Sequence, residues 1–406
     1  MTPLSSNYSE LHHYLKQNVS LDSQTIELKD DLDIVNCDFV SDYRRQSSSN
    51  FVSPGIPAEL IRSLPSEIDL SSLFATPDDD VTENRRFRYH LMHPKSVRKT
   101  KKLIILLHGF NERSWDKYLP WAAHLTAKTG KSVLMFPISF LMNRSPKLWV
   151  DARAMRKVSQ WRKSQHPDVV NSTLSNAAIS ERIHQNPSRF LWSGLETHQN
   201  VVELVKFIRQ GLHEHIDEQA GIDFFTYSIG TFLGEIIMMT NPQGLFSDTK
   251  FAVFCGGAVF DRLSPVSKFI LDSEANARLF SFFVDRLDSH RRNDPYLDEF
   301  LETQSVGKNF HSFLNYRLEL QYRENRLKEL AGQFFAVTMA KDEVVPPLEI
   351  VNTLQGSAGD IDIPVTIFEP TYSYRHEDPF PIASKHIDEV NETFDRIFNL
   401  LGDFLT

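Results

Sequence analysis

The chain has 406 residues, of which 41% are hydrophobic and 24% charged. This ordinary globular composition excludes a disordered, collagen-like or coiled-coil protein. Its longest aliphatic run, Leu103–Leu107, is far shorter than the roughly 20 residues that a membrane-spanning helix needs, so no membrane span is expected. The net charge of −9 argues against nucleic acid as a partner, because phosphate binding requires a basic surface. Two cysteines are too few for a disulfide framework or a zinc site.

The first 84 residues are polar and irregular in pattern. They predict an N-terminal extension, with one or two short helices, that packs on the rest of the chain. Residues 1–20 have neither the apolar core nor the leading basic cluster of a signal peptide, so a cytoplasmic location is expected. Apolar and polar residues then alternate over Arg86–His93, which is typical of an edge strand.

Short apolar runs recur from residue 103 onward, and helical patterns separate several of them. Such continuous hydrophobicity is typical of strands buried on both faces of a parallel sheet. One amphipathic stripe extends from Val201 to Ile216, with Gly221 as its stop, and another covers Ile387–Phe404. The alternation predicts an α/β fold with a mostly parallel, doubly wound sheet over residues 85–406. The expected strands are Leu103–Leu107, Val133–Phe136, Asp223–Tyr227, Phe251–Phe254, Phe334–Thr338 and Val365–Phe368.

Two gaps between these strands are too long for simple crossovers. They cover residues 139–197 and 261–331, and both are expected to be insertions that form a helical cap above the edge of the sheet. Phe and Trp side chains are frequent in both insertions. They predict either the cap's own core or an apolar pocket for substrate.

The segment Thr226-Tyr227-Ser228-Ile229-Gly230 follows an apolar strand and precedes a helical pattern. A strand-to-helix turn with a serine at its apex exposes the hydroxyl at the carboxyl end of the sheet, where ligands bind in open α/β folds. Thr226 departs from the small residue that is usual at this point of the turn. An ordinary strand–helix turn is the alternative interpretation, because Ser and Gly often meet in turns.

The loop after the first buried strand begins with His108-Gly109-Phe110. Its backbone amides can face the serine, and the amides of Phe110 and Ile229 are the candidates for an oxyanion hole. His108 is interpreted as a structural residue that braces this loop. Asn111, Glu112 and Arg113 come next and either line the pocket or form a solvated loop.

Asp342 and His376 each follow a later buried strand, so the chain order of the candidate catalytic residues is Ser228, Asp342, His376. A carboxylate in this position can orient a histidine, which in turn can activate the serine. Asp261 is the alternative acid, and His386 is the alternative base.

These motifs, in this order, resemble the α/β-hydrolase superfamily over residues 85–406. The acid loop, Asp342-Glu343-Val344-Val345-Pro346, is similar to the superfamily's Asp-x-Val-Val-Pro form. The segments His-Gly-Phe-Asn-Glu and His-Glu-Asp-Pro-Phe-Pro also resemble an uncharacterised bacterial branch. The resemblance implies that Ser228 attacks a carbonyl carbon, that His376 takes its proton and that Asp342 orients the imidazole. It implies no metal and no organic cofactor.

The function expected from these residues is hydrolysis of a carboxylic ester or related acyl bond in a small molecule, with room for a hydrophobic part. Peptide cleavage and acyl transfer use the same residues. A non-catalytic protein that binds a ligand or partner is the alternative from another class. Two other clusters are interpreted as non-functional. His213-Glu214-His215 is expected in a helix, where a spacing of two points the rings to different faces. Cys255 is expected to be a small core residue.

Overall fold

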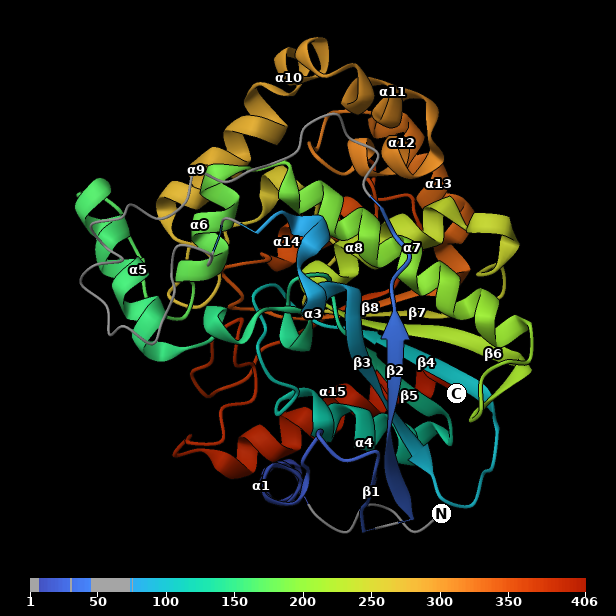
Figure 1. Ribbon diagram of the computed structural model, residues 1–406. Helices are drawn as coiled ribbons and strands as arrows, with labels where there is room; N and C mark the ends of the chain where they lie inside the picture. The colour runs from blue at the N-terminus through green and yellow to red at the C-terminus, as the bar shows by residue number, and fades with distance from the viewer. Residues whose placement is uncertain (1–6, 30, 45–73, 75) are drawn as a thin grey trace.

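The computed structural model describes residues 7–29, 31–44, 74 and 76–406. Within this part of the chain, nine strands form one sheet in the order β1-β2-β3-β5-β4-β6-β7-β8-β9 (Figure 1). The pairs from β1 through β3 to β5 are antiparallel, and every pair from β5 to β9 is parallel. The strands are β1 Thr25–Glu27, β2 Leu32–Val40, β3 Arg86–Pro94, β4 Thr100–Leu107, β5 Ser132–Phe136, β6 Ile216–Tyr227, β7 Phe251–Phe254, β8 Phe334–Met339 and β9 Val365–Phe368.

This strand order is that of the α/β-hydrolase fold, with β1 as an additional edge strand. The two antiparallel strands β2 and β3 come first, β5 and β4 exchange places, and the remaining parallel strands follow in chain order. Parallel strands that lie side by side end at the same edge of the sheet. The loops that follow β4, β6, β8 and β9 therefore lie along one edge, which is where the sequence places the candidate residues.

Helices cover both faces of the sheet (Figure 1). Alternate residues of each central strand pack against opposite layers. In β4, Leu103, Ile105 and Leu107 belong to one core cluster, while Ile104 and Leu106 belong to the other. The second cluster contains α1 (Tyr8–Asn18), α4 (Tyr118–Thr129) and α15 (Ile387–Leu405); the first contains α7 (Arg189–Arg209), α8 (Ile229–Thr240) and α14 (Pro347–Leu354). Both faces of these strands are buried, which explains their continuous hydrophobicity.

The sheet continues beyond β3, and this corrects the prediction of an edge strand at Arg86–His93. β2 pairs with β3 along its whole length, and β3 also pairs with β5, so β3 is an interior strand. No strand was expected before residue 86. The short helix that was expected is α1, whose Ser9 amide donates to Asn391 of α15 at 2.9 Å. Residues 45–73 of the expected N-terminal extension lie outside the described residues.

The helical stripe that was expected from Val201 to Ile216 is wrong at its C-terminal end. α7 ends at Arg209, and Gly211 follows with a φ of +74°. Ile216 begins β6, so its apolar side chain belongs to a strand that happens to continue the helical spacing. His213-Glu214-His215 consequently lies in the connecting loop rather than in a helix.

Both long insertions are helical, and they pack against each other. Residues 139–197 contain α5 (Ala152–Gln165), α6 (Ala177–Gln185) and the start of α7, and Arg162 of α5 is fully buried. Its guanidinium contacts Glu181 of the same insertion and both carboxylate oxygens of Asp272 in the other, at 2.7 and 2.8 Å. The helices of the second insertion are α9 Ser273–Phe280, α10 Leu287–Asn293, α11 Pro295–Thr303, α12 Ser305–Ser312 and α13 Leu320–Leu330.

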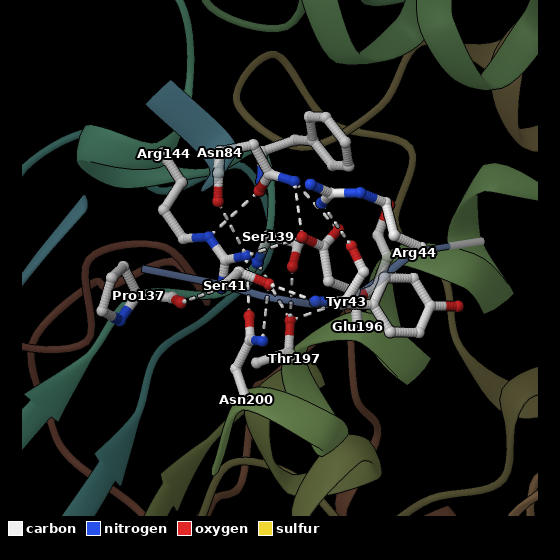
Figure 2. A network of polar contacts seen from close by, with 12 residues as sticks. Ser41, Tyr43, Arg44, Asn84, Pro137, Ser139, Arg144, Glu196, Thr197 and Asn200 are labelled. Atoms are coloured by element: carbon white, nitrogen blue, oxygen red, sulfur yellow. Dashed lines mark hydrogen bonds and ion pairs between the residues drawn. The ribbon is translucent and has the colours of Figure 1, made fainter. Parts of the chain in front are cut away.

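A buried polar network fixes the loop that follows β5 (Figure 2). The guanidinium of Arg144, which is fully buried, lies 3.1 Å from Glu196 of α7 and 3.0 Å from Asn200. Asn84 of the short helix α3 (Thr82–Arg85) accepts from Arg144 and donates to both oxygens of Glu196. Burial lowers the pKa of Arg144 to about 10. The carboxylate of Glu196 raises this pKa and so helps to keep the guanidinium charged.

Replacing Glu196 with glutamine is expected to destabilise the fold by about 3 kcal/mol or more, because it leaves the buried Arg144 cation without its counter-charge. Denaturant unfolding measures the loss. The matched control is Glu299→Gln, an exposed residue of α11, which is expected to change the free energy of unfolding by less than about 0.5 kcal/mol. Equal stability of the two variants would contradict the assigned role of the network.

Candidate active site

Ser228 lies at the apex of the turn between β6 and α8 in a strained backbone conformation, with φ 56° and ψ −124°. A non-glycine residue in such a conformation costs on the order of 1–3 kcal/mol and persists only where the surrounding structure holds it. Gly230 allows the close approach that the turn needs, because a Cβ there would lie 2.4 Å from the carbonyl oxygen of Leu107. The turn therefore presents the serine hydroxyl beyond the end of the sheet.

Thr226 fits into this turn because a glycine elsewhere leaves space for it. Its side chain is fully buried, and its hydroxyl lies 3.1 Å from that of Thr231. A Cβ on Gly234 would lie 3.1 Å from the methyl group of Thr226 and 2.5 Å from the ring of Phe251. Because Gly234 of α8 has no side chain, it leaves room for the methyl group of Thr226. Thr226 therefore fits beside the turn where a smaller residue is usual.

The structure brings together Ser228, His376 and Asp342. His376 Nε2 lies 2.7 Å from Ser228 Oγ, and His376 Nδ1 lies 2.7 Å from Asp342 Oδ2. All three side chains are buried, with relative exposures of 8% for Ser228, 6% for His376 and 4% for Asp342. Asp342 Oδ1 accepts from the amides of Val344 and Val345, each at 3.0 Å. The second oxygen of the carboxylate is therefore held toward the imidazole.

The two alternatives to these residues lie elsewhere. Asp261 accepts from the amide of Tyr316 at 3.0 Å and pairs with Arg262, and burial raises its pKa. His386 is an exposed residue at the start of α15, where it lies 3.3 Å from Glu389. The contacts with Ser228 and the orienting carboxylate belong to His376 and Asp342 instead.

The two candidate oxyanion donors are the amides of Phe110 and Ile229. Ile229 is the first residue of α8, so its amide is one of those that a helix leaves without an internal partner. Within the described part of the chain, the amides of Phe110 and Ile229 donate to no loop, turn or side-chain acceptor. Both residues line the cavity that contains Ser228. Free amides at a helix N-terminus favour negative charge, which suits a developing oxyanion.

His108 has the bracing geometry that was expected of it. It is fully buried, its Nε2 accepts from the amide of Ile138 at 2.9 Å, and its Nδ1 lies 2.8 Å from the carbonyl oxygen of Gly109. Burial lowers its pKa to about 3, so the imidazole is neutral near pH 7. It thereby joins the loop after β4 to the loop after β5.

This low pKa predicts a pH dependence of stability. Near pH 6.5 the unfolded chain protonates His108, whereas the folded protein does so only near pH 3. Between these values the unfolded state holds one more proton, so acidification favours unfolding. The slope of unfolding free energy against pH is expected to be smaller in His108→Gln by up to about 1.4 kcal/mol per pH unit between pH 6 and 4.

Denaturant titrations at a series of pH values measure this slope, which is independent of any constant loss of packing in the variant. The exposed His13→Gln is the control and is expected to keep the wild-type slope. An unchanged slope in His108→Gln would show that this histidine is already protonated in the folded protein.

The sequence reasoning missed a network that joins the oxyanion loop to the histidine loop. Glu112 accepts from Lys117 and from the hydroxyl of Tyr118, the latter at 2.9 Å. The same hydroxyl accepts from the amide of Gly109 at 2.9 Å, and Lys117 also donates to the carbonyl oxygen of Glu377 at 3.0 Å. Glu112 lines a cavity together with Asn111 and Arg113, as one of the two interpretations expected, and its carboxylate also binds Lys117, which reaches the histidine loop.

Tyr227 also contacts the histidine loop. Its ring stacks on the imidazole of His376 with a centroid distance of 5.4 Å and an interplanar angle of 14°. Its hydroxyl donates to the carbonyl oxygen of His376, and the ammonium of Lys117 lies 4.8 Å from the centre of its ring. Tyrosine directly before the serine was the available signal, but nothing in the sequence indicated that its ring meets the histidine loop.

Cys255 is buried, as expected of a small core residue. Burial raises the pKa of Cys255 well above its usual range, so it remains a neutral thiol rather than a nucleophile. Across the described residues, no group of three or more His, Cys, Asp or Glu side chains is placed to hold a metal ion. No helix in the same ranges is long and apolar enough to cross a membrane.

A model of one protein family matches residues 6–406, almost the whole chain. The chain belongs to the DUF6051 family. The description of this family is "family of unknown function", so membership assigns no activity. No curated protein matches the sequence.

Solved esterases and lipases resemble this DUF6051 protein only distantly. Carboxyl esterase 2 from the fungus Tuber melanosporum is 11% identical, with a TM-score of 0.41 over 79% of this chain and 82% of its own. An S-formylglutathione hydrolase from Agrobacterium tumefaciens is 13% identical, with a TM-score of 0.39 over 79% and 91%. A variant of monoglyceride lipase from Saccharomyces cerevisiae is 13% identical, with a TM-score of 0.37 over 79% and 92%. At these scores the strand order, rather than the matches, identifies the fold.

Proposed function

We propose that this DUF6051 protein is a serine hydrolase that cleaves a carboxylic ester or related acyl bond. The observation that carries the proposal is the buried chain of contacts from Ser228 Oγ through His376 to Asp342, with both distances at 2.7 Å. Such contacts allow the imidazole to take the serine proton while the carboxylate stabilises the cation that forms. A non-catalytic binding protein has no need of this geometry, and it is not favoured by any observation here.

The proposed reaction has two stages. Ser228 Oγ bonds to the carbonyl carbon as its proton passes to His376 Nε2, and the amides of Phe110 and Ile229 bind the oxyanion. His376 then returns the proton to the leaving oxygen, the carbon–oxygen bond breaks, and an acyl-serine remains. Water adds to this acyl group by the same route and releases the acid and free Ser228. Each stage uses side chains already present at the site, and no cofactor takes part.

Hydrolysis of p-nitrophenyl acetate and butyrate by the purified protein tests the proposal, with p-nitroanilides of the same acids as amide counterparts. Turnover of the esters is expected, and His376→Ala is expected to lower kcat by about 10⁴-fold or more. The matched control is His386→Ala, which removes an exposed imidazole and is expected to keep wild-type turnover. Equal rates for the two histidine variants, or no ester turnover by the wild type, would reject the proposed function.

A further inference from the structure

We infer that the substrate is an ester of an apolar acid with a polar alcohol, so that the two sides of the scissile bond differ in chemistry. This inference rests on the proposed function. It comes from two different spaces that each share wall residues with the small cavity containing Ser228: an inner cavity behind the oxyanion loop and an outer groove beside the histidine loop.

The surface of the inner cavity is mostly apolar, although Arg113, Arg182 and Arg189 are also among the residues that line it. It has a volume of about 100 Å³ and extends between the oxyanion loop, α6, α7 and α8. A second, smaller cavity of about 40 Å³ contains Ser228. The two share the side chains of four residues in their walls, so little separates the inner cavity from the nucleophile. These residues are Phe110, Phe190, Ile229 and Phe232.

Phe190 of α7 is the centre of the wall between the two cavities. Its ring lies 6.0 Å from that of Phe110, 6.0 Å from Phe232 and 5.3 Å from Phe260. Further along α7, Gly194 and His198 also line the inner cavity. Because a helix rises 1.5 Å per residue, the eight positions from Phe190 to His198 span about 12 Å. Since an extended chain covers about 3.5 Å in three bonds, this length matches a chain of about ten bonds.

The outer groove is wider and more polar than the inner cavity. It is open and wide, at about 960 Å³, and His376 is part of its wall. Hydroxyl, amide and charged side chains dominate the rest of its lining, including Ser264, Thr371, Lys341 and Arg375. Phe110 and Ile229 do not line this groove, and His376 lines neither cavity. His376 therefore borders the polar groove, whereas Phe110 and Ile229 border the two apolar cavities.

The chemistry of acyl transfer assigns a side of the ester to each space. The leaving oxygen must reach His376 Nε2, because it receives the proton that the imidazole took from Ser228. The alcohol attached to this oxygen consequently extends along the groove that His376 lines. The carbonyl oxygen occupies the position between the two amides, so the acyl chain is left with the inner cavity. An apolar chain there removes apolar surface from water, and a polar alcohol keeps its hydrogen bonds in the open groove.

A pair of reversed esters tests the assignment with the wild-type protein. Glyceryl monooctanoate places the apolar chain on the acyl side, and octyl glycerate places the same groups the other way round. We expect kcat/KM for glyceryl monooctanoate to be at least tenfold higher. Along a series of glyceryl esters from acetate to octanoate, we expect kcat/KM to rise by about threefold per methylene. Equal rates for the reversed pair, or a preference for octyl glycerate, would overturn the inference.

Gly194 offers a variant that fills the inner cavity without a clash. A Cβ on Gly194 would meet no atom within 4 Å, and leucine is also a better helix former than glycine. In Gly194→Leu, kcat/KM for the octanoate is expected to fall at least tenfold, while that for the acetate stays within twofold of wild type. Gly332→Leu is the control, since its Cβ also enters open space but at the exposed surface, and it is expected to leave both rates unchanged.

The outcomes separate this inference from the proposed function. If the wild type hydrolyses none of the glyceryl or p-nitrophenyl esters, the proposed function fails. If it hydrolyses the acetate but Gly194→Leu lowers all esters in equal proportion, the site is a hydrolase and only the assignment of the two spaces is wrong.

Discussion

Ser228→Ala is expected to lower kcat/KM for ester substrates by at least 10⁴-fold, and by as much as about 10⁶-fold. The alanine removes the hydroxyl oxygen that forms the acyl intermediate in the proposed reaction. It leaves the backbone turn unchanged, because alanine adopts the strained conformation of residue 228 no less readily than serine. The residual rate comes from substrate binding and the oxyanion donors alone. Steady-state kinetics measures the loss.

A thermal unfolding curve accompanies the kinetics of Ser228→Ala, to show that the loss does not come from unfolding. The variant gives up a single hydrogen bond, to His376, so its melting temperature is expected to stay within a few degrees of wild type. A folded variant that kept a tenth or more of the wild-type kcat/KM would rule out Ser228 as the nucleophile.

Asp342→Asn is expected to lower kcat by about 10⁴-fold. The replacement keeps Oδ1, so the amides of Val344 and Val345 retain their acceptor and the loop keeps its shape. At the position of Oδ2, asparagine has an NH2 group, which donates to His376 Nδ1. Nδ1 then carries no proton, so the proton of the neutral imidazole lies on Nε2. The imidazole then cannot take the proton of Ser228.

Asp261→Asn is the matched control for this variant. It makes the same change of carboxylate to amide at the alternative acid, and its side-chain oxygen can still accept from Tyr316. Wild-type kcat is expected for Asp261→Asn. If instead it lost activity and Asp342→Asn did not, the acid would be Asp261, and the contact between Asp342 and His376 would be without catalytic consequence.

The central strands and the order of the candidate residues could be predicted from the sequence because both depend on local signals. Strands buried on both faces need apolar residues at consecutive positions, and the runs at Leu103–Leu107 and Phe251–Phe254 show this directly. The loops after neighbouring parallel strands meet at one edge of the sheet, so Ser228, Asp342 and His376 could be placed together from the sequence, although β9, the strand before His376, is an edge strand and only partly buried.

The antiparallel strands could not be predicted in the same way. β2 contains Asp33, Asn36 and Asp38 among its apolar residues, so its pattern is that of an irregular polar segment. Its partner β3 shows alternation, which is typical of a strand with one solvated face, although β2 covers its outer edge. Whether a strand lies at an edge depends on a pairing with residues some 50 positions away, and no local pattern records it.

The end of α7 was misjudged because two periodicities coincide. Ile216 falls at a helical spacing from Ile208 and Leu212, yet Leu212 is 58% exposed and Ile216 is buried in a strand. The helix ends at Arg209, and the stop signal is the left-handed Gly211 just beyond it rather than Gly221. The support of the histidine loop by Lys117 and Tyr227 was missed for a related reason, since it depends on side chains that only the folded sheet edge brings together.

Labelling with a fluorophosphonate, followed by intact-protein mass spectrometry, tests the claim that Ser228 is an activated nucleophile. Such a probe bonds to a serine only where a base and oxyanion donors activate it. The wild type is expected to take up one probe per chain at Ser228, Ser228→Ala none, and His376→Ala only at a greatly reduced rate. Folded wild-type protein that stays unlabelled, or equal labelling of Ser228→Ala, would contradict the account.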